Sequence, residues 1–169
     1  MIFQIAGQAP KVNWKRNVGR KKRTIAEAIA VAEANGLIIP GDVVFVEAES
    51  GDLPGGFKNF NGMETARGPD VTEHPDGCTY WHDHYNRFGK IVIRVHPEVL
   101  TGDECIVGVF QHELFELAAL REVFMLDKRK RMNATDYGTQ VLPGYKGNFH
   151  DQAWDASDEA VHRMRTAKR

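Results

Sequence analysis

The hydrophobic pattern first becomes regular just after residue 24, where it predicts a short helix. Apolar residues recur there at helical spacing: Ile25, Ala28, Ile29 and Ala32. This spacing places them on one face of an α-helix. Thr24 can cap the helix, and Glu27 stands three residues later, which is the spacing of a capping box. Asn35-Gly36 then ends the pattern.

β-branched and aromatic residues predict three strands further along the chain. The strands are expected at residues 42–48 (DVVFVEA), 78–84 and 90–96 (KIVIRVH). Residues 49–77 are rich in Gly, Pro, Asn and Asp and predict a long loop, which we expect to border the functional site. Three polar residues are assigned to this loop: Asp70, Glu73 and His74.

A long and almost wholly apolar stretch predicts a second helix, from Thr101-Gly102-Asp103 to about Asp127. Its apolar residues cover nearly the whole circumference of a helix: Val107, Val109, Phe110, Leu114, Phe115, Leu117, Leu120, Val123 and Phe124. A helix that is apolar on all sides is usually buried.

A connection at residues 133–148 precedes a last predicted helix, which begins at Asn148 or Asp151 and ends near Arg165. The apolar face of this helix comprises Phe149, Ala153, Ala156, Ala160 and Met164. Its more polar side carries Asp151, Asp155, Asp158 and His162. The order of elements predicts an α+β fold with a small sheet, a central buried helix and a C-terminal helix.

The composition is that of one compact domain, with 169 residues and 42% hydrophobic content. We expect a basic N-terminal arm at residues 1–23 and a single domain at residues 24–169. The formal net charge of −1 and the pI of about 6.7 do not favour a nucleic-acid partner. Basic residues nevertheless form two clusters, which we expect to be solvated: Lys11, Lys15, Arg16, Arg20, Lys21, Lys22 and Arg23, and Lys128 to Arg131.

Cysteine usage and hydropathy predict a soluble cytoplasmic protein, and a domain of a larger secreted system would show the same features. Cys78 and Cys105 are the only cysteines and form no Cys-x-x-Cys pair, which fits two ordinary thiols and leaves a single disulfide open. The N-terminal apolar run is too short for a signal peptide, and no later run approaches the length of a membrane span. The oligomeric state is left open by the sequence.

Three polar residues stand inside the apolar second helix, in the run Gln111 to Leu117 (QHELFEL). His112 and Glu116 are four residues apart and therefore point the same way, with Glu113 beside them. In a His-Glu-x-x-His helix, residues at these two positions hold Zn²⁺ and the intervening Glu activates water. The pattern favours a metal site, and a buried His112–Glu116 ion pair is the alternative.

Residues 90–127 resemble the zincin metallopeptidases. In those enzymes an edge strand runs past the substrate and is followed by the metal-binding helix, as KIVIRVHPEVL is followed here by VGVFQHELFEL. The resemblance implies a zincin-like fold with Glu113 as the general base. Zincins end the motif with His, whereas this chain has Glu116, giving the variant His-Glu-x-x-Glu. A more anionic ligand set makes metal-bound water less acidic.

A third metal ligand is expected from the last helix, because catalytic zinc usually has three protein ligands. His150 is the first choice, since it can face inward from the first turn of that helix. Zincins commonly take their third ligand from a downstream helix. Asp151 and Asp155 are the alternatives, either as ligands or as acceptors for an imidazole N–H.

A second histidine cluster follows the long predicted loop and includes His82, His84 and His96, with Asn86 among them. Alternation along a strand would place His82 and His84 on one face. The run is superficially similar to that of the His-Asn-His endonucleases, but no helix follows Asn86 as their fold requires. His82 and His84 are therefore expected to border the cleft or to be exposed at a strand end.

The function that the sequence favours is hydrolysis of a peptide or protein substrate by a metal enzyme with one metal ion per chain. Zinc is expected, with manganese or iron as alternatives. His112, Glu116 and His150 would hold the metal and Glu113 would act as general base. Two other functions stay open: an inactive zincin-like binding or regulatory module, and a metal-dependent nuclease that uses His82 and His84.

Overall fold

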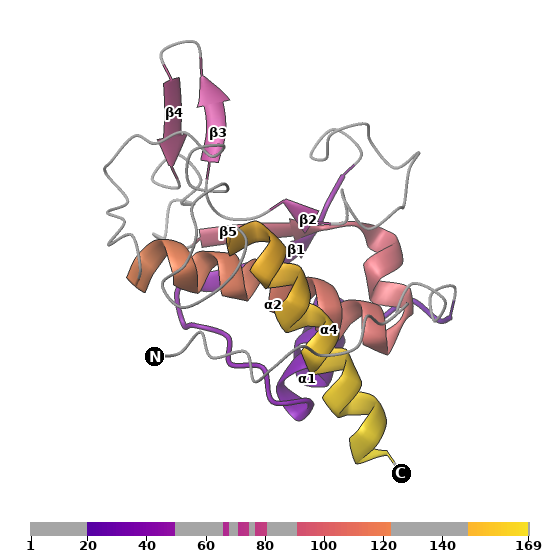
Figure 1. Cartoon of the computed structure of the whole chain (residues 1–169). Helices are drawn as coiled ribbons and strands as arrows, with labels where there is room; N and C mark the ends of the chain where they lie inside the picture. Colours follow the sequence, from indigo (N-terminus) through magenta and orange to yellow (C-terminus); the bar gives the residue numbers. More distant parts are fainter. Residues whose placement is uncertain are drawn as a thin grey trace.

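The computed structural model describes residues 20–49, 66–67, 71–74, 77–80, 91–122 and 149–168 (Figure 1). In chain order the elements are α1 (Ile25–Ala34), β1 (Val43–Glu47), β2 (Ala66–Arg67), β3 (Val71–His74), β4 (Gly77–Tyr80), β5 (Ile91–Val95), the 3₁₀ helix η3 (Pro97–Thr101), α2 (Asp103–Glu122) and α4 (Phe149–Ala167). This combination of helices and small sheets confirms the predicted α+β class.

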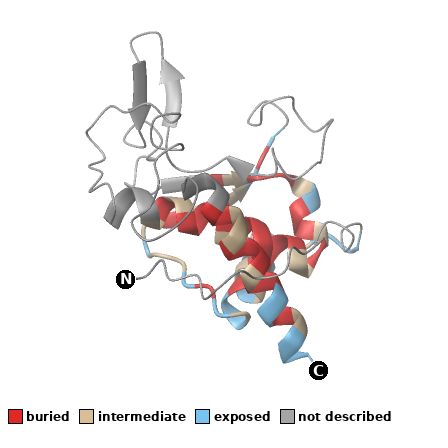
Figure 2. Ribbon diagram, in the orientation of Figure 1, coloured by how far each residue is buried: buried red, intermediate tan, exposed pale blue. Residues whose placement is uncertain are grey.

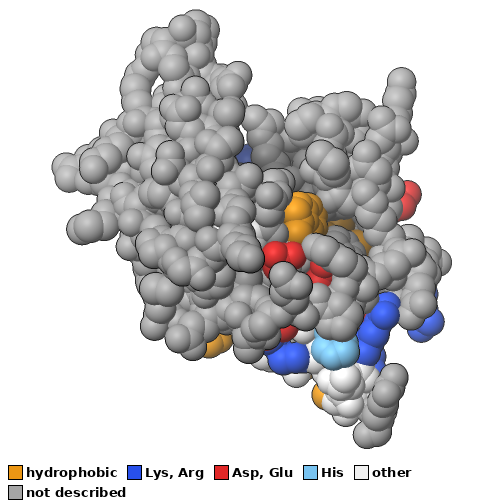
Figure 3. All heavy atoms as spheres, viewed as in Figure 1, with side chains coloured by type: hydrophobic (Ala, Val, Ile, Leu, Met, Phe, Trp, Pro, Cys, Tyr) orange, Lys and Arg blue, Asp and Glu red, His pale blue; other side chains and the backbone are white. Residues whose placement is uncertain are grey.

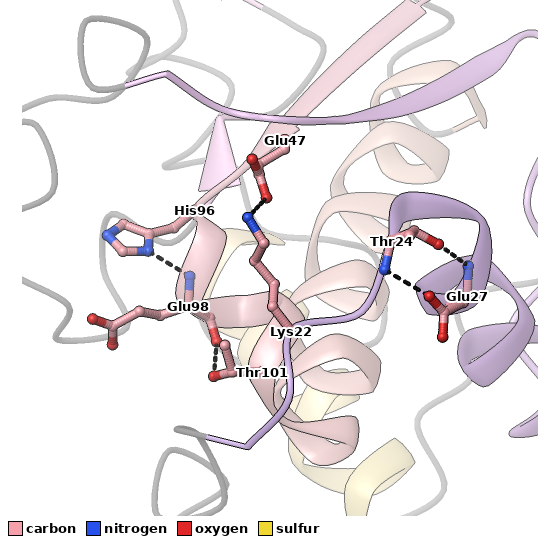
Figure 4. A network of polar contacts seen from close by, with 7 residues as sticks. All are labelled: Lys22, Thr24, Glu27, Glu47, His96, Glu98 and Thr101. Carbon is pink, nitrogen blue, oxygen red and sulfur yellow. Dashed lines mark hydrogen bonds and ion pairs between the residues drawn. The ribbon is translucent and has the colours of Figure 1, made fainter.

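The first helix, α1, begins and ends where the pattern predicts. The Thr24 hydroxyl accepts a hydrogen bond from the Glu27 backbone N–H at 3.1 Å, and the Glu27 carboxylate accepts one from the Thr24 N–H at 3.2 Å (Figure 4). These two bonds, the backbone one above all, lower the pKa of the Glu27 carboxyl. Asn35 caps the other end, and Gly36 follows with a φ of 88°, which glycine adopts without a Cβ penalty.

The main sheet has the strand order β1-β5-β2. β1 runs parallel to β5, in a register from Val43↔Ile91 to Glu47↔Val95. β2 is antiparallel to β5 and pairs only two residues with it, Arg94 and Val95. The edge position expected for residues 90–96 from the zincin resemblance is therefore wrong, because β5 is the central strand. The reason is that β2, a strand of two residues, is too short to show an alternating pattern in the sequence.

β3 and β4 form a separate two-stranded sheet; β3 lies within the region that we predicted as a loop, whereas β4 begins at the last residue of that region and continues into the predicted strand. The two strands are antiparallel, in a register from Val71↔Tyr80 to His74↔Gly77. Glu73 and His74 therefore belong to a strand, and their assignment to a loop is wrong. β3 (VTEH) consists mostly of polar residues, so its sequence lacks the alternation of apolar and polar residues that predicts a strand. Figure 1 shows this hairpin standing away from the main sheet.

A buried histidine, His96, connects β5 to the short helix η3. Its Nδ1 accepts a hydrogen bond from the Glu98 backbone N–H at 3.0 Å, so the imidazole caps η3 (Figure 4). Pro97 occupies the first helical turn, where its missing N–H costs nothing. Because an accepting nitrogen carries no hydrogen, the neutral ring holds its proton on Nε2.

The last helix, α4, packs antiparallel against α2, as successive contacts show. Near the start of α2, the Arg165 guanidinium donates two hydrogen bonds to the Glu104 carboxylate, at 2.6 and 2.8 Å. This pairing raises the pKa of Arg165. One turn further along α2, the buried Ser157 hydroxyl lies 2.6 Å from the Gly108 carbonyl oxygen.

The hydrophobic core lies between the main sheet, α1, α2 and α4, and Figure 2 shows buried residues on both α2 and α4 in the middle of the molecule. The predicted burial of α2 is confirmed, because nearly all of its described side chains from Cys105 to Leu117 are buried. Phe110 of α2 stacks on Phe45 of β1 with ring centroids 4.0 Å apart. Cys105 is a buried thiol and not half of a disulfide. Among the described helices, none combines the length and apolarity needed to cross a bilayer.

Candidate metal centre

Two potential ligands, His112 and Glu116, meet on α2 as their spacing predicts. His112 Nε2 lies 3.3 Å from Glu116 Oε1, and the two side chains are 4% and 16% exposed. Four residues correspond to slightly more than one helical turn, so the helix itself brings the two groups together. The apolar residues around them keep both groups inside the protein.

The separation of these two atoms fits a shared metal ion. Zinc binds histidine nitrogen and carboxylate oxygen at about 2.0–2.2 Å, so two ligands in tetrahedral geometry lie about 3.3 Å apart. The His112–Glu116 distance of 3.3 Å matches this value. The same distance also fits a hydrogen-bonded ion pair, so both interpretations of the sequence remain compatible with this contact.

Glu113 completes a cluster of three potential ligand side chains. One ligand atom from each of His112, Glu113 and Glu116 can be chosen so that all three lie within 4.8 Å of one another. Glu113 is 4% exposed, and its Oε2 is shielded from solvent, as is His112 Nδ1. Two carboxylates beside one imidazole form a donor set suited to a divalent cation.

The indole of Trp154, on α4, covers the imidazole of His112. The ring centroids are 3.8 Å apart and the ring planes are inclined by 35°. Trp154 therefore limits the rotation of His112 and excludes water from one face of its ring. Because Trp154 comes from a different helix, the candidate centre belongs to the α2–α4 interface and not to α2 alone.

The expected third ligands all lie on α4. His150 and Asp151 are in its first turn, and their side chains lie outside the described part of the structure. Asp155 is half-buried. Asp158, which we predicted on the polar side of this helix, is 7% exposed, and that prediction is wrong. The face of α4 that is buried is broader than the apolar stripe, because Gln152 on its border is buried as well.

The second histidine cluster is not brought to this centre by any described contact. His82 and His84 lie outside the described residues, because β4 ends at Tyr80. The strand predicted at residues 78–84 is therefore confirmed only as far as Tyr80. His96 is described, and its Nδ1 is engaged with the Glu98 backbone.

Sequence reasoning missed the role of Trp154 in the candidate centre. The indole stands four residues after His150, on the same side of α4, and this spacing is the signal that could have revealed it. Ser157, which ties α4 to α2, was missed too, because a serine in a helix gives no sign of its partner.

Compared with protein-family models, with curated proteins and with solved structures, the chain shows no significant match.

Proposed function

We propose that this chain is a metal-dependent hydrolase of the zincin type that cleaves amide bonds in a peptide or protein. The observation that carries the proposal is the buried His112–Glu116 contact at 3.3 Å, with the Glu113 carboxylate beside it. This arrangement supplies two ligands and a base from a single turn of helix.

The antiparallel packing of α2 and α4 indicates which residue of α4 lies opposite Glu116. Trp154 contacts His112, and the helices run antiparallel. Glu116 is one turn after His112 on α2, and residue 150 is one turn before Trp154 on α4. In an antiparallel pair of helices these two positions face each other. His150 is therefore our proposed third ligand, in preference to Asp151 or Asp155.

The proposed chemistry assigns the proton transfers to Glu113. A bound divalent ion would polarise the substrate carbonyl and stabilise the negative charge that develops on its oxygen. Glu113 accepts a proton as the water oxygen forms its bond to the carbonyl carbon. It then donates that proton to the nitrogen as the C–N bond breaks, leaving an acid and an amine.

Zinc is the proposed metal, and manganese and iron are the alternatives. Imidazole suits zinc and iron, whereas carboxylate oxygen also suits manganese. Replacing the second histidine of a zincin motif with Glu116 adds an oxygen ligand and so widens this choice.

The test is elemental analysis of protein purified without added metal or chelator. The wild type is expected to contain about one equivalent of zinc, manganese or iron, and His112→Ala is expected to lose it. His162→Ala is the matched control, because it removes an exposed imidazole from α4. Glu113→Gln should keep the metal and lose cleavage of a fluorogenic peptide library.

A second candidate function follows from the same contact. If His112 and Glu116 form an ion pair, the chain is a metal-free binding module of the same fold. Wild-type protein that contains no metal, even after incubation with zinc, would reject the hydrolase and favour this alternative.

A further inference from the structure

A pocket of about 150 Å³ lies at the opposite end of the α2–α4 interface from the candidate metal centre. Its lining comprises Arg20, Arg23, Thr101, Asp103, Glu104, Met164 and Lys168. Three parts of the chain meet there: the segment before α1, the junction of η3 with α2, and the end of α4. Asp103 and His112 are nine residues apart on α2, or about 13 Å along its axis, so the two sites are distinct.

Both carboxylates of this pocket already have cationic partners. Asp103 lies 2.9 Å from the Arg23 guanidinium, and Glu104 receives two hydrogen bonds from Arg165. A carboxylate held by a guanidinium is neutralised and repels an incoming anion less strongly than a carboxylate alone.

Two cationic side chains that line the pocket, Arg20 and Lys168, are not among these ion pairs. Within the described part of the chain, neither Arg20 nor Lys168 forms an ion pair with a carboxylate. Both are exposed and line the pocket, Arg20 from the segment before α1 and Lys168 from the position directly after α4. Figure 3 shows lysine and arginine side chains gathered toward the C-terminal end of α4 on the face in view.

The backbone of the N-terminal segment is held in place beside this pocket. The Arg20 N–H donates to the Thr101 carbonyl oxygen at 3.1 Å, and the Arg23 N–H donates to the Leu100 carbonyl oxygen at 2.8 Å. Both arginines therefore start from fixed backbone positions, so little backbone freedom is lost when a ligand binds.

We propose that this pocket binds a phosphate group, either free or carried on a small phosphate monoester. Two cations without carboxylate partners match the charge of a phosphate group, which is about −1.5 to −2 at neutral pH. Arginine forks suit its oxygens, and Arg23 uses only part of its donor set on Asp103. A cavity of about 150 Å³ holds a molecule as large as benzene and so accommodates a phosphate.

The test is isothermal titration of the full chain with inorganic phosphate, with the ionic strength held constant by chloride. The wild type should bind about one phosphate, and Arg20→Gln/Lys168→Gln should bind it at least about tenfold more weakly. The control, Lys21→Gln/Arg163→Gln, removes the same charge from neighbouring positions outside the pocket and should change the Kd less than about twofold. The backbone bonds of Arg20 are unaffected by these changes, so the fold should be retained.

A second titration, with glycerol phosphate, distinguishes the two sources of the group. Tighter binding than that of inorganic phosphate assigns the site to a phosphate monoester, and equal or weaker binding assigns it to free phosphate. The proposal is overturned if the wild type shows no saturable binding, or if the control variant loses as much affinity as the pocket variant. Neither result depends on the metal centre.

Discussion

At each end of the α2–α4 interface, a carboxylate of α2 lies beside a nitrogen-containing side chain, an arginine at one end and a histidine at the other. The two pairs differ in whether they can bind a metal ion. At the first end, Glu104 is bound by Arg165 of α4, which raises the pKa of the guanidinium. At the other end, Glu116 lies beside His112 of its own helix. A guanidinium is always protonated and binds no metal, whereas a neutral imidazole is a common metal ligand. The first contact is therefore a fixed link between helices, whereas the second joins two groups of the kind that bind metal ions.

The largest expected effect separates these two carboxylates. Glu116→Gln should weaken zinc binding by at least about 100-fold, because it removes a charged ligand. Glu104→Gln should change zinc affinity less than about threefold and should lower the free energy of unfolding by about 1–2 kcal/mol, because it weakens two charged hydrogen bonds. Competition with a chromophoric chelator measures the affinities, and urea unfolding measures the stabilities. Equal losses of zinc affinity in Glu116→Gln and Glu104→Gln would show that the carboxylate of Glu116 is not a metal ligand.

Trp154 allows a sharper test of the metal end. Trp154→Ala should weaken zinc binding about tenfold, because the His112 ring becomes free to rotate. It should also destabilise the fold by about 2–3 kcal/mol. Trp154→Phe keeps a ring over His112 and should restore most of the affinity.

Val161→Ala is the matched control for this experiment, because Val161 is a buried residue of α4 that no described contact links to His112. It should lower stability and leave zinc affinity unchanged. If Val161→Ala weakens zinc binding as much as Trp154→Ala does, Trp154 acts only through the stability of the fold.

Between the two ends, Ser157 should contribute to stability alone. Ser157→Ala removes the hydroxyl bonded to the Gly108 carbonyl and should lower the free energy of unfolding by about 1–2 kcal/mol. Thr166→Ala removes a similar bond, to the Arg163 carbonyl, at an exposed position of α4 and should cost less than about 0.5 kcal/mol. Equal costs in urea unfolding would mean that the interhelical bond adds nothing.

The smallest effect is expected far from this interface, at the cap of α1. Thr24→Ala should cost about 1 kcal/mol and raise the pKa of Glu27 toward its ordinary value, as an NMR titration would measure. Because the folded-state pKa of Glu27 is lowered, its contribution to stability is present above its unfolded pKa. This contribution is lost as the pH falls through the folded pKa. The difference between wild type and variant should therefore shrink in acid, and a constant difference would contradict the prediction.

The sequence predicts correctly those contacts that form between residues a few positions apart. The contact between His112 and Glu116 follows from helical periodicity over four residues, and the cap formed by Thr24 and Glu27 follows from three. Both were predicted correctly because the helix alone sets their geometry.

What could not be predicted depends on partners that are distant in the chain. The central position of β5 comes from pairing with Ala66 and Arg67, which show no strand pattern of their own. Burial of Asp158 depends on which other parts of the chain pack around α4, and the pattern of one helix does not encode that. The phosphate pocket likewise gathers Arg20 and Lys168 from opposite ends of the chain.

The antiparallel contact of α2 with α4 also bears on the order in which the molecule assembles. His112 and Glu116 meet as soon as α2 forms, whereas Trp154 arrives only when a segment some forty residues later has docked. An ion captured early would be held by α2 alone, and weakly. If the docked state binds the ion better, as the proposed site requires, a higher metal concentration would favour docking of α4 on α2, and docking of α4 would slow the release of the ion.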